Sequence, residues 1–387
     1  MIYLDSAATT PVAPEVMQEM ESFFTEQYGN AGSIHKLGRD AAAAISKARE
    51  QVSSLIGADP EQIIFTSGGS EANSLVFQGI KEHLLKIGKK TIIVSAVEHN
   101  SVLKAAKALC ETNGFVLKYV GVDKYGRVPA NVLASMITPD VGFVSVMYVN
   151  NETGMVNPVQ QIGRICKENN ILFHTDCVQA AGCNPINVDE INCDFLSISA
   201  HKMHAPKGVG ALFARDKSIL TPIIYGGAEQ EFGLRGGTEN TAGIVGFGKA
   251  CELALAKDSK YNQVKQLEWV NQLKRDFIKE MRRSCRDLFR VNGCIINNSG
   301  KAMSIRFNGV DAQSLVLALE SRGICVSAGS ACESHESKPS HVLLAMGLTE
   351  EQARNSIRIS FSAVNEKIDA YSAASSMSLC VKKLAQG

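Results

Sequence analysis

Residues 171–214 read ILFHTDCVQAAGCNPINVDEINCDFLSISAHKMHAPKGVGALFA, and this stretch decides the fold class. It contains three short apolar runs of the length of a buried strand: ILFHTDC, DFLSISA and VGALFA. Similar runs come before it, namely QIIFTS, KTIIVSA and VGFVSVMYV, and helical stretches such as EANSLVFQGIKEHLLK alternate with them. Because strands that alternate with helices form βαβ units, the sequence predicts an α/β fold with a mainly parallel sheet.

The chain after about residue 258 has a different pattern. A long helical stretch, YNQVKQLEWVNQLKRDFIKEMRRSC, is followed by a strand AMSIRFNG, a helix AQSLVLALESRG and a strand SIRISFS. We therefore expect a second, smaller part of the α+β class. Within it, the run CVSAGSACESHES places Cys332 among small residues that form neither a core nor a rigid site, before a helix expected to begin near Lys338.

Composition and charge limit the function classes. Of the 387 residues, 45% are hydrophobic and 20% are charged, so the chain can bury a sizeable core. Its 40 Lys and Arg residues balance 39 Asp and Glu residues, which excludes a global field that would attract nucleic acid or an anionic membrane. The local cluster MRRSCRDLFR is interpreted as the solvated face of a helix rather than as a phosphate site.

The N-terminus and the cysteines indicate a cytoplasmic protein. The first residues, MIYLDSAATT, lack the basic and apolar regions of a signal peptide, and no apolar run approaches the ~18 residues that a membrane span needs. A cytosolic location is therefore the default expectation, with no membrane partner. The eleven cysteines are then expected to be reduced thiols, most of them small buried hydrophobes.

Ligands of parallel sheets bind at the carboxyl ends of the strands, so polar residues just after the apolar runs are candidate site residues. The stretch IIFTSGGSEANSL places Gly68, Gly69 and Ser70 between a strand and a helix, where backbone N–H groups and the helix dipole favour a phosphate. The alternative is an ordinary turn with Ser70 as helix N-cap. A Walker motif is absent, and GIVGFGKACE has Cys251 where a dinucleotide-binding loop needs its third glycine.

Two neighbouring strand ends offer a carboxylate and an amine. ILFHTDCVQ ends its strand with Asp176, and FLSISAHK ends the next one with Ser199, His201 and Lys202. One interpretation is an ion pair. The other is a site for pyridoxal phosphate, which needs an amine for a Schiff base, a carboxylate for its pyridine nitrogen and a cradle for its phosphate. Lys202, Asp176 and the Gly68–Ser70 turn would supply all three.

Two further strand ends fit this interpretation. SAVEHNS places His99 where an imidazole could stack on the pyridine ring, and YVNNETG places Asn151 at another strand end. Taken alone, each is more often a hydrogen-bonded loop or core residue. A metal site is a further alternative for four residues: His174, Cys177, His201 and His204. Because their spacings match no zinc signature closely, we expect no metal ion.

A series of motifs, in order and across nearly the whole chain, resembles the cysteine desulfurases of the NifS/IscS branch: YLDSAATTP, YGNAGSIH, TSGGSEAN, VEHNSV, VNNETG, HTDCVQ, SAHKMHAPKGVG, RGGTEN, SAGSACES and NSIRISFS. The resemblance implies a fold type I pyridoxal-phosphate enzyme of aminotransferase class V, which is a homodimer with active sites at the subunit interface. It implies a large domain over residues 12–258 with a mainly parallel seven-stranded sheet. Residues 1–11 and 259–387 would form a smaller α+β domain that carries the cysteine loop.

The resemblance also implies roles for individual residues. Lys202 would form the Schiff base, Asp176 would pair with the pyridine nitrogen, and His99 would stack on the ring and act as an acid or base. Gln179 would approach the phenolic oxygen of the cofactor. Its phosphate would lie against a set of small and polar residues, the last of them from the other subunit: Gly69, Ser70, Ser199, His201 and Thr238.

The substrate-side residues follow from the same resemblance. Arg358 and Asn151 would bind the carboxylate of L-cysteine, a task that suits the bidentate fork of arginine, and Asn151 would also contact the cofactor. Cys332 would be the nucleophile that takes the substrate sulfur. The small residues 327–331 would give it the freedom to reach the substrate and then swing outward to a partner. Thiolate is the reactive form, so a base such as His99 would help Cys332 to lose its proton.

The implied reaction converts L-cysteine to L-alanine and leaves sulfur on Cys332 as a persulfide. A sulfur-accepting protein, either a scaffold or a sulfur carrier, would receive it for iron–sulfur clusters or other sulfur compounds. A selenocysteine lyase or another aminotransferase-like pyridoxal-phosphate enzyme is the alternative, and a non-catalytic module of sulfur-transfer assemblies is disfavoured by the joint presence of Lys202, Asp176 and Cys332. Ala328, Glu333 and the ending KKLAQG depart from common family patterns, which leaves the acceptor open.

Overall fold

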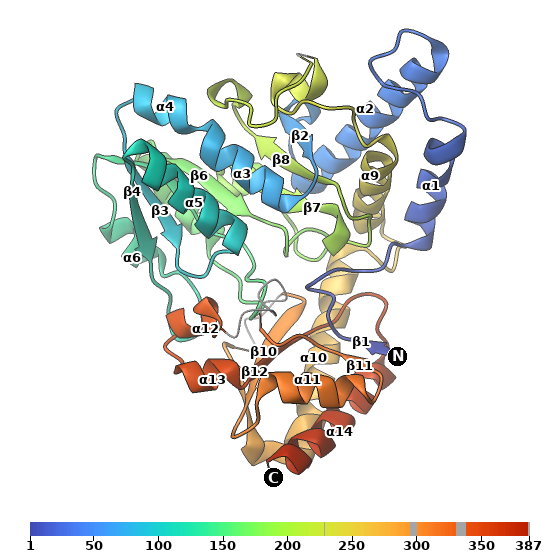
Figure 1. Ribbon diagram of the computed structural model, residues 1–387, viewed down its shortest axis with the longest axis vertical. Coiled ribbons are helices and arrows are strands. Elements are labelled where there is room, and N and C mark those ends of the chain that lie inside the picture. The colour runs from blue at the N-terminus through green and yellow to red at the C-terminus, as the bar shows by residue number, and fades with distance from the viewer. Residues whose placement is uncertain (228, 295–299, 330–337, 386–387) are drawn as a thin grey trace.

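The computed structural model describes residues 1–227, 229–294, 300–329 and 338–385, and a seven-stranded sheet forms its centre (Figure 1). β8 runs antiparallel to both of its neighbours, and all other neighbouring strands of this sheet are parallel, which confirms the predicted mainly parallel sheet. In spatial order the strands are β2 (Ile63–Thr66), β8 (Gly210–Ala214), β7 (Phe195–Ser199), β6 (Leu172–Asp176), β5 (Val141–Ser145), β3 (Thr91–Ser95) and β4 (Val116–Val120).

Burial on both faces explains why these strands read as continuous apolar runs. Every residue of β2, β3, β5, β7 and β8 is buried. Alternate side chains enter two different hydrophobic clusters, because successive residues of a strand point to opposite faces. In β7, Phe195 packs into one cluster, whereas Leu196 and Ile198 pack into the other. A parallel sheet covered on both sides needs apolar residues at every position.

Helices cover both faces of the sheet (Figure 1). One face is covered by α3 (Gly69–Gly79), α4 (Lys81–Lys86) and α5 (Asn100–Asn113). The other face is covered by α1 (Pro14–Thr25), α2 (Lys36–Ile56), α6 (Ala130–Ser135), α7 (Val159–Glu168), α8 (Val188–Ile191) and α9 (Thr241–Leu255). Short 3-10 helices are η1 (Pro60–Gln62), η2 (Ala200–Lys202), η3 (Lys217–Ile219), η4 (Gln230–Gly233) and η5 (Arg286–Leu288).

The C-terminal part has a hydrophobic core of its own, to which Leu4 also belongs. Its antiparallel sheet has the order β12-β10-β9, and a parallel pair joins the N-terminal β1 to β11 (Figure 1). The strands are β1 (Ile2–Tyr3), β9 (Phe289–Asn292), β10 (Ala302–Phe307), β11 (Ile324–Cys325) and β12 (Ser356–Ser360). The helices are α10 (Gln263–Cys285), α11 (Ala312–Glu320), α12 (His341–Ala345), α13 (Glu350–Arg354) and α14 (Lys367–Leu384).

The predicted α+β pattern of this part is confirmed, whereas the helix expected near Lys338 begins at His341. Ser340 is the N-cap of that helix, because its side chain accepts a hydrogen bond from the backbone N–H of Leu343. The domain boundaries between residues 11 and 12 and between residues 258 and 259 stay predictions.

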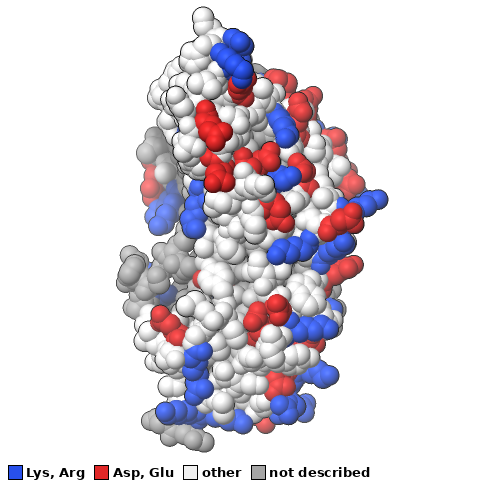
Figure 2. Space-filling model, turned by 90° about the vertical axis from the view of Figure 1, so that its right-hand side faces the viewer, with Lys and Arg blue, Asp and Glu red and all other residues white. Residues whose placement is uncertain are grey.

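Surface charge agrees with the near-neutral composition. On the face that Figure 2 shows, Lys and Arg side chains are interspersed with Asp and Glu side chains. This mixture matches a formal net charge of +1. Among the described residues, no helix is both long and apolar enough to cross a membrane.

Candidate active site

A cavity of about 230 Å³ lies where the ends of the central strands meet the N-terminal segment and β12. Ten of the residues predicted for the site line this cavity: Gly69, Ser70, His99, Asn151, Asp176, Gln179, Ser199, His201, Lys202 and Arg358. Thr238 does not line it and is exposed. Cys332 lies outside the described residues, so its predicted role stays a prediction.

Lys202 ends the short helix η2, which directly follows β7. Its Nζ donates hydrogen bonds to the main-chain oxygens of Ala7 at 2.5 Å and Ala8 at 2.7 Å. The side chain of Gln179 donates to the same Ala7 oxygen at 3.0 Å. The N-terminal segment therefore forms one wall of the cavity and holds the lysine amine in it.

Asp176 ends β6 and is buried. One carboxylate oxygen accepts a hydrogen bond from the side-chain amide of Asn73 at 2.8 Å, and the other accepts from the backbone N–H of Val178 at 2.9 Å. Both of these donors are neutral. The amide of Asn73 also donates to the hydroxyl of Ser101 at 2.8 Å. These hydrogen bonds fix the orientation of the carboxylate, which lines the cavity. A partner for a ring nitrogen needs such a fixed orientation.

His99 is the N-cap of α5, where Nδ1 accepts a hydrogen bond from the backbone N–H of Ser101 at 3.2 Å. Nδ1 also lies 2.8 Å from the Ser101 hydroxyl. Burial lowers the pKa of His99, the positive charges of Lys202 and Arg358 act in the same direction, and Asp176 opposes them. The imidazole is therefore neutral near pH 7, as a proton acceptor in this cavity has to be.

The turn before α3 is shaped by close backbone packing. α3 begins at Gly69 with Gly68 as its N-cap, so the alternative with Ser70 as N-cap is wrong. A Cβ on Gly69 would lie 2.6 Å from the Cγ2 of Val178, which leaves no room for a side chain. The hydroxyl of Ser70 is not used as a cap, and the helix N-terminus and this residue together line the cavity. Such a helix start favours an anion.

The other two polar groups at this turn come from the end of β7 and from η2. Ser199 is the last residue of β7, and His201 follows in η2. Burial lowers the pKa of His201 to about 4, and the charges of Lys202 and Lys207 act in the same direction. The ring is therefore neutral at pH 7, with Nδ1 placed 3.1 Å from the hydroxyl of Thr9. A neutral imidazole and two hydroxyls suit hydrogen bonding to a phosphate.

Arg358 reaches the cavity from β12 and is only 3% exposed. Its Nη2 lies 2.8 Å from a carboxylate oxygen of Asp5, and Nη1 donates to the main-chain oxygen of Asn151 at 3.3 Å. Within the described part of the chain, the buried Nε of Arg358 and the buried Oδ1 of Asn151 have no hydrogen-bond partner. Because buried polar atoms are rarely left without partners, this corner of the cavity is prepared for a polar ligand.

The residues that border segment 330–337 are attached to the site. The backbone of Ser327 exchanges two hydrogen bonds with that of Arg358, at 2.7 Å and 3.2 Å. On the other side, the hydroxyl of Ser340 donates to a carboxylate oxygen of Glu152 at 2.5 Å, and Nε2 of His341 lies 2.9 Å from the main-chain oxygen of Glu98. Glu98 and Glu152 are sequence neighbours of His99 and Asn151. Ser327, Ser340 and His341 are therefore hydrogen-bonded to residues that line the cavity or adjoin its lining.

Sequence reasoning missed several functional neighbours. Asn73 lies within α3 and Ser101 within α5, at positions where a polar residue carries no signal of its own. The carbonyls of Ala7 and Ala8 have no side-chain signal either, because any residue has the same main-chain oxygen. Once the bounds of α3 are known, Asn73 can be expected near the site, because it lies about one turn after Gly69 on the same face of the helix.

The residues of the metal alternative have structural partners. Nδ1 of His174 lies 2.8 Å from the hydroxyl of Ser145, and Nε2 lies 3.0 Å from that of Ser197. His204 contacts the main-chain oxygen of Pro11 with Nδ1, and its ring packs against Tyr261. Among the described residues, no group of three or more His, Cys, Asp and Glu side chains could hold a metal ion.

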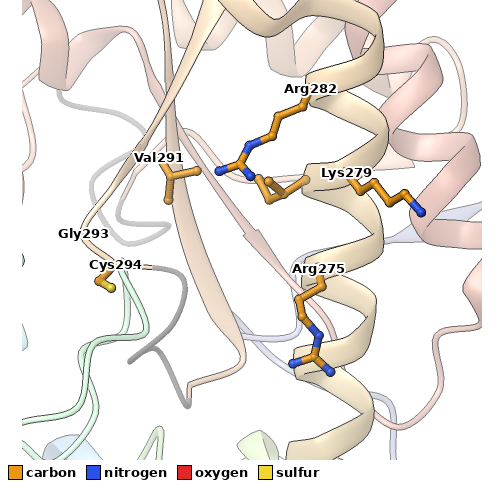
Figure 3. A pocket seen from close by; sticks show the side chains of 7 residues that line it. Arg275, Lys279, Arg282, Val291, Gly293 and Cys294 are labelled. Atoms are coloured by element: carbon orange, nitrogen blue, oxygen red, sulfur yellow. The ribbon is translucent and has the colours of Figure 1, made fainter.

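A larger cavity of about 560 Å³ lies away from the strand ends, between α10 and β9 (Figure 3). It is lined by Arg275, Lys279 and Arg282 of α10 and by Val291 of β9. In Figure 3 the Lys279 side chain points away from β9. The described lining contains no Asp, Glu or His, so this cavity lacks the acid and base groups of the first one. The arginines of the stretch MRRSCRDLFR are exposed as predicted, but only the first half of the stretch lies in α10; the rest forms η5 and the start of β9.

Comparisons with known proteins agree with this geometry. The model of the aminotransferase class-V family matches residues 2–370. A cysteine desulfurase IscS of Dictyoglomus turgidum is 43% identical over 368 residues, which is 95% of this chain and 91% of that protein. A solved structure named NIFS-like protein has a TM-score of 0.90 and 32% identity, with 99% of each chain covered.

A second solved structure, SspA in complex with cysteine, has a TM-score of 0.81 and 35% identity, with 95% of this chain and 100% of that chain covered. The likeness therefore extends over nearly the whole chain. The chain belongs to the class-V aminotransferase family, in the branch formed by the cysteine desulfurases.

Proposed function

We propose that this protein is a pyridoxal-phosphate-dependent cysteine desulfurase that moves the sulfur of L-cysteine to Cys332. The observation that carries the proposal is the shared cavity, in which Lys202, Asp176 and the start of α3 face one another beside Arg358. The names of its relatives, and the cysteine in the SspA complex, support the same substrate. The alternative, a selenocysteine lyase, would use the same residues.

The residues present fit pyridoxal phosphate. Asp176, fixed by Asn73 and Val178, would hold the pyridine nitrogen, and Gly69, where Val178 leaves no room for a Cβ, lets the start of α3 pack closely against the loop after Asp176. Ser70, Ser199 and His201 would hold the phosphate; Gln179 would approach the phenolic oxygen, and His99 would lie against the ring. When bound, the cofactor supplies an electron sink that stabilises negative charge at the substrate α-carbon.

The chain's own groups would then divide the work of the reaction. Arg358 would bind the substrate carboxylate through its bidentate fork, and Asn151 beside it would fix the orientation. The amine of Lys202 would take the α-proton, and neutral His99 would accept a proton from a thiol. The Cys332 thiolate would form an S–S bond to the substrate sulfur while the substrate C–S bond breaks. The electron pair of the C–S bond would stay with the substrate carbon, which would take up the thiol proton held by His99, and Lys202 would return the α-proton, so that the three-carbon product leaves as L-alanine.

A homodimer would complete the site. Several large apolar side chains of the α1–α2 region and of the segment after η3 are exposed in the single chain: Met17, Phe24, Tyr28, Ile34 and Tyr225. Exposed apolar groups of this size support an interface with a second copy. Thr238 is exposed, so it is available to the phosphate of a partner's site.

The remaining parts of the proposal concern domains, acceptor and location. The C-terminal hydrophobic core, which contains Leu4 and is distinct from the two clusters on the faces of the large sheet, supports a large domain over residues 12–258 and a small one from 1–11 and 259–387. The persulfide would be handed to a sulfur-accepting protein for iron–sulfur clusters or other sulfur compounds. By likeness to the family, the enzyme would work in the cytoplasm.

The proposal is tested by measuring L-alanine, sulfide and keto acid in the same reaction mixture with L-cysteine. We expect alanine to equal the sulfur released, Lys202→Ala to lose the cofactor's visible absorption, and Cys332→Ala to keep that absorption but lose sulfur transfer. Formation of a keto acid in place of alanine would move the protein to another activity of its family. Faster turnover of selenocysteine than of cysteine would select the lyase.

A further inference from the structure

Two lysine side chains are buried in the interior, which is unusual for this residue type. Lys274 of α10 is 2% exposed, and Lys301, directly before β10, is 1% exposed. Neither residue has a role in the proposed chemistry, and neither lines the cavity. Burial of an amine costs desolvation free energy unless hydrogen bonds offset it. The acceptors of these two amines therefore indicate what each one stabilises.

Lys301 makes its hydrogen bond to the turn that carries the reactive amine. Its Nζ donates to the main-chain oxygen of Lys202. The preceding carbonyl of this turn, that of His201, accepts hydrogen bonds from Thr10, at 2.9 Å from the hydroxyl and at 3.0 Å from the backbone N–H. Thr10 and Lys301 belong to segments far apart in the sequence. The turn is therefore held from two directions, and Lys301 holds the residue that bears the amine.

Lys274 has the same burial but a different acceptor. Its Nζ donates to the main-chain oxygen of Gly300 at 2.6 Å. The backbone N–H of Gly300 in turn donates to the oxygen of Gly154 at 3.1 Å. Lys274 therefore supports the chain that leads into β10, whereas Lys301 reaches across to η2. Within the described part of the chain, Lys301 donates to the candidate catalytic turn and Lys274 donates to Gly300, so the two lysines can be compared directly.

The titratable groups around Lys301 come from three elements. Cys183 follows β6 and is also affected by Lys274 of α10, and His201 and His204 belong to the turn after β7. Burial lowers the pKa of Lys301, and Cys183 opposes this effect. Positive charge on Lys301 in turn contributes to the lowered pKa of both histidines. Lys301 therefore adds a positive potential to the region of Lys202, besides its hydrogen bond.

We propose that Lys301 is a positioning residue for Lys202, which it serves by binding the Lys202 main-chain oxygen from the start of β10. The inference rests on the proposed function, because it needs Lys202 to be the reactive amine. With this bond in place, the lysine side chain leaves the turn in a fixed direction toward the cavity. Without it, the carbonyl can rotate and the amine loses its alignment with the substrate α-carbon. Misplacement of a catalytic group by even ~1 Å reduces rates strongly.

The test compares Lys301→Met with Lys274→Met in the holoenzyme loaded with pyridoxal phosphate. Both variants replace a buried amine by an apolar side chain of similar length, so both change the interior in the same way. Lys382→Met, on the exposed side of α14, controls for the loss of a lysine as such. For each protein we would measure kcat and KM for L-cysteine, the thermal midpoint, and the pH midpoint of the cofactor's visible absorption without substrate.

For Lys301→Met we expect kcat to fall about tenfold while KM changes by less than about twofold, since the substrate-binding arginine is untouched. The absorption midpoint should move to higher pH, because the positive charge of Lys301, which opposes protonation near Lys202, has been removed. Lys274→Met should leave kcat and the absorption midpoint unchanged, even if its thermal midpoint falls as much as that of Lys301→Met.

The outcomes separate this inference from the proposed function. If Lys301→Met matches Lys274→Met in kcat and in the absorption midpoint, the positioning role is wrong, although the enzyme is a desulfurase. If both variants lose kcat in proportion to their thermal midpoints, Lys301 is structural only and the proposal is again wrong. If the unmodified protein binds the cofactor but forms no alanine, the proposed function fails first.

Discussion

Gly69 shows at the scale of one residue how close packing sets the start of α3 beside the carboxylate of Asp176. A Cβ at this position would lie 2.6 Å from the Cγ2 of Val178. Val178 belongs to the loop that directly follows Asp176. The hydrogen bond from Val178 N–H fixes Asp176. Crowding at Gly69 would therefore disturb both the helix start and the carboxylate, which are the two ends of the proposed cofactor site.

Gly69→Ala should weaken cofactor binding by about 5-fold to 150-fold, because an added methyl group in a packed site costs about 1–3 kcal/mol. Equilibrium titration of the apoenzyme with pyridoxal phosphate, followed by absorbance, gives the affinity. Gly121→Ala is a matched control, since a Cβ there meets nothing within 4 Å. Val178→Ala combined with Gly69→Ala should recover part of the affinity. Unchanged binding by Gly69→Ala would contradict this account of the cradle.

Arg358 is the residue proposed to bind the substrate carboxylate. Its guanidinium is already held by Asp5 and by the Asn151 carbonyl, so it is prepared for a planar carboxylate. Arg358→Lys should raise KM for L-cysteine about 10-fold to 100-fold, because a single ammonium cannot replace a bidentate fork. Cofactor absorption should stay as in the unmodified enzyme. An unchanged KM would place the substrate carboxylate elsewhere.

At the scale of elements, η4 combines strain with a buried ion pair. Glu231 and Phe232 have φ values of 43° and 60°, a left-handed conformation that is uncommon outside glycine. The carboxylate of Glu231 accepts two hydrogen bonds from Arg49 of α2, at 2.8 Å and 2.7 Å, and one from the backbone N–H of Phe65 at 2.7 Å. These bonds hold the segment that continues toward Thr238.

Glu231→Gln should lower the free energy of unfolding by about 3–5 kcal/mol, because it leaves the largely buried Arg49 without its counter-charge. Urea unfolding of the holoenzyme, followed by circular dichroism, measures the change. Glu252→Gln removes an exposed carboxylate from α9 and serves as the control, with a change below about 1 kcal/mol. If the two variants unfold alike, the ion pair does not hold η4.

Six strands of the large sheet could be predicted from the sequence because each is a short apolar run between turns, whereas β4, VLKYV, is mostly not buried and has no such run. The site residues at their ends, such as Asp176 and Lys202, follow from the rule for parallel sheets. Asn73 and Lys301 could not be predicted, because their roles depend on contacts between segments that are distant in the sequence. The alternative prediction that Ser70 caps α3 was wrong, because Gly68 is the N-cap and close packing at Gly69 determines that turn.

At the scale of the whole molecule, buried histidines link stability to pH. Burial lowers the pKa of His174 and of His204 to about 3 and that of His201 to about 4. In the unfolded chain each of these groups titrates near its ordinary value of about 6.5. Below that pH the unfolded state binds more protons than the folded state, so stability is fully present above pH 6.5 and falls as the pH decreases toward 4.

His174→Gln tests this linkage, because His174 lies in the central sheet and does not line the cavity. At pH 7 the variant should be less stable by about 1–3 kcal/mol, since it loses the bonds to Ser145 and Ser197. Between pH 6.5 and pH 5 the unmodified protein should lose about 2 kcal/mol more than the variant. Denaturant unfolding at the two pH values gives the difference in the free energy of unfolding between the unmodified protein and the variant. A difference that is the same at both pH values would show that His174 does not titrate on unfolding.

The central claim is that one chain brings together a cofactor lysine, a carboxylate partner and a cysteine that receives sulfur. The most direct measurement is mass spectrometry of the purified holoenzyme after brief incubation with L-cysteine, with alanine measured in the same sample and Cys332→Ser in parallel. The account predicts a gain of one sulfur atom on the peptide that contains Cys332, equal in amount to the alanine, and no such gain in the variant. Alanine formed without a persulfide on Cys332, or in equal amount by Cys332→Ser, would contradict it.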